Sequence, residues 1–210
     1  MAQYILKFVL KILFIQYCLD KIIRVTKKYD ISCQPQIYYP NKYWWVTTVL
    51  MIGPAANNVS VGVLIFMSLL FALAYMDFKL QEVYNSLLIC YMFTAIFIYW
   101  NVLYNYDINS AGAIILVFYF YLLGLIGIYA LADAVVMAGI VLLAASSSEH
   151  YVIISILCFI CIQIQILIVH CILSVFKYKK VSNCNIAVIP FAAISVYSVI
   201  WAGIIFDIFK

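Results

Sequence analysis

The sequence predicts an all-α fold, a polytopic bundle of about eight transmembrane helices. Of its 210 residues, 69% are hydrophobic and 10% are charged, whereas a soluble domain has roughly 45–50% apolar and about 25% charged residues. So few charges cannot cover a soluble globule of this size. The apolar segments also come close to the ~20 residues that a helix needs to cross a bilayer. They lack the strict alternation of apolar and polar residues that is typical of strands.

The first of two predicted units, residues 1–58, holds two N-terminal segments and the most basic part of the chain. Residues 4–19 are apolar apart from two Lys and one Gln, residues 21–42 are polar and basic, and residues 43–56 form a short apolar segment that ends at Asn57. Because cytoplasmic loops of membrane proteins are rich in Lys and Arg, we place the basic stretch in the cytoplasm. Whether the two apolar segments cross the bilayer or lie in its interface stays open.

The second predicted unit, residues 59–210, is a core of six helices. Each helix is an apolar run that ends at polar or charged residues. Two of these runs end at an acid, because Asp77 follows residues 61–76 and Asp133 follows residues 111–132. The predicted helices cover residues 60–76, 85–104, 111–132, 134–145, 151–176 and 186–206.

Asp77 and Asp133 are the acids that we expect to carry function. An ionised carboxylate at the edge of the hydrocarbon is costly, so an acid retained there is a functional candidate. If successive helices alternate in direction, both acids reach the same membrane face. Two close carboxylates cannot both ionise cheaply, so such a pair shares a proton and titrates as a unit. Simpler interpretations are that Asp77 caps a helix junction and that Asp133 is a buried structural acid.

The cations predict the orientation of the bundle. Tracing eight helices from an external N-terminus places residues 21–42, Lys79 and residues 177–180 on the same side as both acids. Three lysines near the two ends of the chain fall on the other side. This asymmetry predicts that the acids face the cytoplasm. The net charge of +4 therefore indicates orientation, and we expect membrane lipid but no nucleic acid as a partner.

No metal or cofactor site is predicted. Among the seven Cys residues, Cys158 and Cys161 have the spacing of a metal or redox motif. They lie within an apolar run without a second pair, which indicates packing. Gln163, His170 and Ser174 share one face of the same predicted helix. These three side chains fit hydrogen bonds between helices better than a substrate path.

The residues that follow Asp77 match a known signature. Lys79 comes two residues after this acid and Asn85 comes eight residues after it. The pattern resembles the first signature of the type IV prepilin peptidases and preflagellin peptidases, a family of membrane aspartic peptidases. In that signature an Asp ends a helix, a basic residue follows, and Ile-Pro-Asn comes next. Tyr84 stands where the family has its Pro.

Two further stretches are similar to the same family. Its second signature is Gly-x-Gly-Asp followed by x-Lys. Here Asp133 is kept, whereas Ala130 and Ala132 replace the two Gly and Val135 replaces the Lys. Residues 189–192, Ile-Pro-Phe-Ala, resemble the family's Ile-Pro-Phe-Gly-Pro stretch. The resemblance therefore spans most of the chain, with a degenerate second signature.

The resemblance implies a function and a set of residues. The chain would be a membrane aspartic endopeptidase of a prokaryotic cytoplasmic (inner) membrane, which removes the basic leader of prepilin-like precursors at the cytoplasmic face. Asp77 and Asp133 would be catalytic, one as base and the other as acid, and Lys79 and Asn85 would bind substrate. No cofactor is implied. Bacterial members often carry a zinc loop with two Cys-x-x-Cys pairs, but only Cys33 remains here, so no zinc site is expected.

Two alternative functions stay open. Ala favours continued helix where Gly would permit local unwinding. The chain could therefore be a catalytically impaired relative that binds pilin-like helices during assembly. Asp77 and Asp133 could also form the proton site of a proton-coupled membrane carrier. A carrier needs a polar path to the far side of the membrane, for which His170 is the sole candidate.

Overall fold

The computed structural model consists of helices joined by turns throughout the part that it describes. The described residues are 9–15, 17, 20–21, 41–57, 59–80, 83–103, 108–147, 151–175 and 187–205. Within them, seven helices have defined bounds: α2 (Asn41–Ala56), α3 (Val61–Leu80), α4 (Asn85–Leu103), α5 (Ile108–Leu125), α6 (Leu131–Ser147), α7 (Tyr151–Val175) and α8 (Ile189–Ile205). Residues 9–15 are also helical. The predicted all-α fold is confirmed, whereas most of the basic stretch 21–42 lies outside the described residues.

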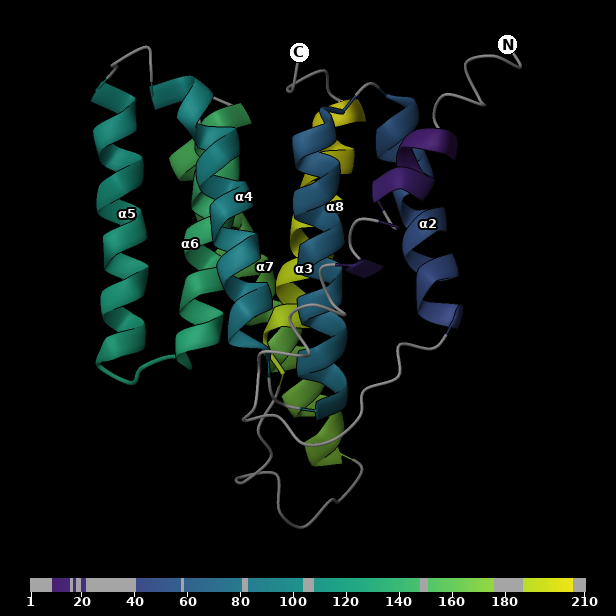
Figure 1. Ribbon diagram of the computed structural model, residues 1–210. Coiled ribbons are helices and arrows are strands. Elements are labelled where there is room, and N and C mark those ends of the chain that lie inside the picture. Colours follow the sequence, from purple (N-terminus) through teal and green to yellow (C-terminus); the bar gives the residue numbers. More distant parts are fainter. Residues whose placement is uncertain are drawn as a thin grey trace.

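The helices run side by side in one bundle (Figure 1). Helix α6 packs against α4, α5 and α7, and helix α8 packs against α3 and α7. Helix α4 also packs against both α3 and α6. Helices α5 and α2 lie at the two outer edges. The two helices that carry the candidate acids, α3 and α6, are therefore connected through α4 and α8.

The junction of α5 and α6 differs from the prediction. The apolar run 111–132 was expected to be one helix ending at Asp133, but α5 ends at Leu125 and α6 begins at Leu131. Gly127 has a φ of 81°, and the N–H of Ile128 donates to the Leu123 carbonyl at 3.0 Å. This is a Schellman cap, in which glycine takes the left-handed conformation after the last helical turn. Asp133 consequently lies in the first turn of α6.

Tyr91 is the central contact between α3, α4 and α6. Its side chain is fully buried, and its hydroxyl donates to the Val136 carbonyl of α6 at 2.9 Å. Its ring lies 4.6 Å, centroid to centroid, from the ring of Phe66 in α3. Gly139 leaves the space that the ring occupies, since a Cβ added there would collide with it. The aromatic ring thus fixes how closely α6 approaches α4.

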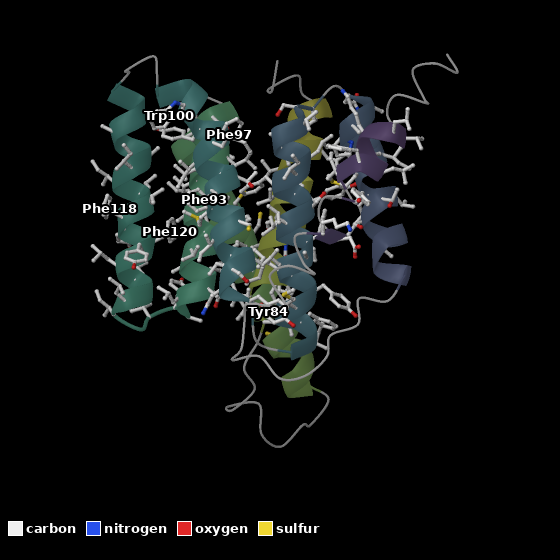
Figure 2. The ribbon with its side chains drawn as sticks, viewed as in Figure 1. Tyr84, Phe93, Phe97, Trp100, Phe118 and Phe120 are labelled. Atoms are coloured by element: carbon white, nitrogen blue, oxygen red, sulfur yellow. The ribbon has the colours of Figure 1, made fainter. Side chains whose placement is uncertain are left out.

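Large apolar side chains cover the outside of the bundle. Phe93, Phe97 and Trp100 follow one face of α4 and are 68%, 72% and 61% exposed, and Phe118 on α5 is 63% exposed (Figure 2). Among the described residues, one stretch, Val61–Phe78 of α3, is long and apolar enough to cross a membrane by length and composition. Six other helices are apolar over shorter stretches.

The contact between Gly139 and Tyr91 gives a stability prediction. We expect Gly139→Ala to lower the free energy of unfolding by about 1–3 kcal/mol, because the new methyl group overpacks a buried ring. Gly62→Ala is the matched control, since its nearest neighbour would be the Ile98 side chain at 3.1 Å, which can move aside. Thermal unfolding in detergent compares the two variants. Equal stability of Gly139→Ala and wild type would contradict the packing described here.

Candidate active site

Both candidate acids lie at the same end of the bundle. Helices α3, α5 and α7 end there, and α4, α6 and α8 begin there, at the lower end in Figure 1. Asp77 is in the last turn of α3 and Asp133 is in the first turn of α6. Each carboxylate is half-buried. The predicted placement of the two acids at one end is therefore found, although Asp133 begins a helix instead of ending one.

Asp77 caps the first turn of α8. Its Oδ2 accepts the backbone N–H of Ile189 at 3.0 Å, and the Val188 amide also contributes a hydrogen bond. Pro190 has no N–H, and the Phe191 N–H donates to the Val188 carbonyl. A carboxylate is favoured at a helix N-terminus because it satisfies amides that have no partner in the helix. The interpretation of Asp77 as the cap of a helix junction is thus correct, whatever else this acid does.

Asp133 lies within the electrostatic reach of Asp77. The Ala134 N–H donates to the Ala130 carbonyl at 3.0 Å, so Ala130 is the N-cap and Asp133 is the third residue of α6. An acid in this turn is stabilised by the helix dipole. The charge of Asp77 acts on the Asp133 carboxylate. Two acids from different helices therefore lie near enough at this end of the bundle for the charge of Asp77 to reach Asp133.

The other predicted site residues lie at the same end of the bundle. Lys79 belongs to the last turn of α3, and its side chain lies outside the described residues. Asn85 is the first residue of α4, and its side chain is exposed. Tyr84, which stands in place of the family's Pro, is 3% exposed and lies at this end of the bundle (Figure 2). The structure thus brings Asp77, Asp133 and the start of α8 together.

Tyr129 is a residue at this end of the bundle that the sequence analysis missed. It lies in the turn between α5 and α6 and is half-buried. The Gln163 side-chain amide donates to its hydroxyl oxygen at 3.5 Å, and its ring meets the ring of Phe159 edge to face at 6.4 Å. Burial raises the pKa of the Tyr129 phenol, and the charges of Tyr119 and Asp133 raise it further. The phenol therefore keeps its proton at neutral pH.

Gln163 forms a hydrogen bond to another part of the bundle. Its bond to Tyr129 joins α7 to the α5–α6 turn, as the interpretation of hydrogen bonding between helices predicts. The His170 and Ser174 side chains lie outside the described residues. Cys158 is buried and Cys161 is exposed on α7, and no group of three or more His, Cys, Asp or Glu side chains that could hold a metal ion occurs among the residues that the structure describes.

Comparison of the chain with protein-family models, with curated proteins and with solved structures gives no match. Two carboxylates whose charges interact can share a proton. One water held between such a pair can be activated for attack on a carbonyl group.

The cap on α8 gives a second stability prediction. We expect Asp77→Ala to lower the free energy of unfolding by about 0.5–2 kcal/mol, because the Ile189 amide loses its acceptor. Asp77→Asn keeps an acceptor oxygen and should cost less. Amide hydrogen exchange at Ile189, measured alongside thermal unfolding, should quicken in Asp77→Ala and change little in Asp133→Asn. Unchanged exchange at Ile189 in Asp77→Ala would show that the cap is not formed.

Proposed function

We propose that this protein is a membrane aspartic endopeptidase that removes the basic leader of prepilin-like precursors. The observation that carries the proposal is the placement of Asp77 and Asp133 at the same end of the bundle, where the charge of Asp77 reaches the Asp133 carboxylate. A second contact supports it, because Asp77 bonds to Ile189 in the Ile-Pro-Phe stretch. Two of the stretches that resemble the peptidase signatures are thus in contact, and the third lies at the same end of the bundle.

The proposal includes a multi-pass arrangement in a prokaryotic cytoplasmic membrane. The apolar side chains exposed along α4, α5 and α7 support it, because exposing such surface to water costs about 25 cal/mol per Å². The length of the helices supports it too. Helix α7 has 25 residues, or roughly 37 Å at 1.5 Å per residue, and a hydrocarbon core is about 30 Å thick. Lipid is then the partner that covers these faces, and the acids face the cytoplasm.

The proposed reaction is hydrolysis of one peptide bond by a water molecule between the two acids. The ionised carboxylate takes a proton as the water oxygen attacks the carbonyl carbon, and the protonated carboxyl donates to the carbonyl oxygen. The tetrahedral intermediate then collapses, the C–N bond breaks, and the leaving amine takes up a proton. Because the pair shares its proton, neither Asp77 nor Asp133 is assigned as the acid. No metal takes part in these steps.

The place of the site fits the proposed substrate. A prepilin-like precursor has a short basic leader directly before a hydrophobic helix, so its cleaved bond lies at the membrane edge. Asp77 and Asp133 lie at the ends of apolar helices, which supports a site for such a bond. Asn85 is exposed at the same end and can hydrogen-bond to the extended backbone of the leader. Lys79 is the second proposed substrate-binding residue, from the last turn of α3.

Two observations favour the non-catalytic alternative. Asp77 is already bonded to the α8 amides, as a purely structural cap would be. Ala130 and Ala132 also keep α6 helical up to its cap, where the family's two Gly residues would allow unwinding. A catalytically impaired relative that binds pilin-like helices during assembly would retain both features.

Cleavage in membranes distinguishes the two functions. We expect wild type to process a precursor that carries a basic leader before an apolar helix, and Asp77→Asn or Asp133→Asn to reduce the rate by about 10²–10⁴-fold. Asp20→Asn, on the N-terminal helix, is the control. The rate of wild type should fall at both low and high pH, because the active pair holds one proton. Processing that survives in both variants would refute the peptidase, and inactive wild type would favour the non-catalytic binder.

The membrane orientation has a test of its own. In a variant whose seven cysteines are replaced, Asn57→Cys and Ile128→Cys place single thiols at opposite ends of the bundle, in the α2–α3 turn and the α5–α6 turn. Both residues are exposed. We expect a membrane-impermeant maleimide to label position 57 in intact spheroplasts and position 128 only in inverted vesicles. Labelling of both positions from one side would contradict the multi-pass arrangement.

A further inference from the structure

We propose that α2 is a spanning helix of the bundle, held upright against α8 by a hydrogen bond from the Tyr197 hydroxyl. The sequence of this segment allows either a spanning or an interfacial helix. The inference rests on the multi-pass part of the proposed function and does not need the peptidase reaction. Helix α2 has 16 residues, or roughly 24 Å at 1.5 Å per residue, whereas a hydrocarbon core is about 30 Å thick. A helix this short needs contacts with other helices to stay upright.

One backbone carbonyl of α2 lacks its usual donor. Pro54 lies inside the helix and has no N–H, so the carbonyl of Leu50, four residues earlier, loses its helical hydrogen bond. Inside a bilayer no water can replace that bond, and an unpaired backbone carbonyl is costly there. A spanning α2 therefore needs a hydrogen-bond donor from a neighbouring helix at this position.

Helix α8 supplies that donor and a second contact one turn further on. The Tyr197 hydroxyl donates to the Leu50 carbonyl at 2.9 Å. A Cβ added at Gly53 would collide with the indole ring of Trp201, so the glycine makes room for that ring. Residues three or four apart share one face of a helix. Because both contacts advance in the same direction along the two chains, α2 runs parallel to α8 and shares its orientation in the bundle (Figure 1).

The Tyr197 ring has contacts that do not involve α2. It meets the ring of Phe71 in α3 edge to face at 5.9 Å. About two turns away along both helices, the Ile189 N–H donates to Asp77. Helix α8 is therefore joined to α3 at two points, and Tyr197→Phe keeps both of them. This substitution should loosen α2 while the cap at Asp77 stays in place.

A double-mutant cycle tests the bond. We expect Tyr197→Phe to lower the Tm in detergent by about 2–10 °C, because the Leu50 carbonyl loses its donor. In Pro54→Ala the new N–H supplies the helical bond, so adding Tyr197→Phe should cost less than about half as much. Ser198→Ala is the matched control, since its hydroxyl bonds within α8, to the Ile194 carbonyl, and it should match wild type. An equal cost of Tyr197→Phe in both backgrounds would overturn the inference.

The depth of α2 in the membrane tests its orientation. In a variant whose seven cysteines are replaced, a fluorophore is attached at Val49→Cys or at Asn57→Cys, both exposed positions, and brominated lipids report its depth by quenching. An upright α2 places position 49 roughly 12 Å deeper than position 57, at 1.5 Å per residue. Equal depths would indicate an interfacial helix and overturn the inference, whatever the cleavage assay shows. The expected depths in a protein that cleaves no precursor would support it and count against the peptidase alone.

Discussion

The arrangement of the two acids depends on one buried tyrosine. The Tyr91 hydroxyl bonds to the Val136 carbonyl, one turn beyond Asp133 in α6, and its ring packs on Phe66 of α3. A buried phenol without an acceptor would cost about 1–3 kcal/mol, so the bond restricts the positions that α4 and α6 can take. Gly139 has no side chain, whereas a Cβ at this position would collide with the Tyr91 ring and hold the helices apart. The spacing of the acid-bearing helices is therefore set in the core, away from the acids themselves.

Helix termini offset the repulsion between the acids. Asp133 lies in the first turn of its own helix, where the dipole favours an anion. Asp77 lies in the last turn of α3, where the dipole opposes an anion, but its carboxylate bonds to the first amides of α8. Both acids thus face helix N-termini, and this end of the bundle gathers the starts of α4, α6 and α8. The bond from the Ile189 amide also holds the Asp77 carboxylate in a fixed orientation, which a reacting group requires.

The sequence predicts the helices well and their junctions less well. The bounds of α3, α4, α7 and α8 follow the apolar runs to within a few residues, because polar residues interrupt hydropathy at their ends. The run 111–132 has no such interruption. Hydropathy alone therefore predicts one helix where the structure has α5 followed by a turn. Gly127 was the local signal for that turn. The roles of Tyr91 and Tyr129 depend on contacts with distant helices, which a single sequence does not encode as a pattern.

The break between α5 and α6 changes the chemistry that the site can perform. Had α5 continued to Asp133, Tyr129 would have been one turn inside that helix and Asp133 at its negative end. With the turn at residues 126–130, the phenol lies on an irregular segment between two helices, and Asp133 takes the positive end of α6. Helix α7 then holds Tyr129 through Phe159 and Gln163, so a third helix fixes the turn that leads into Asp133.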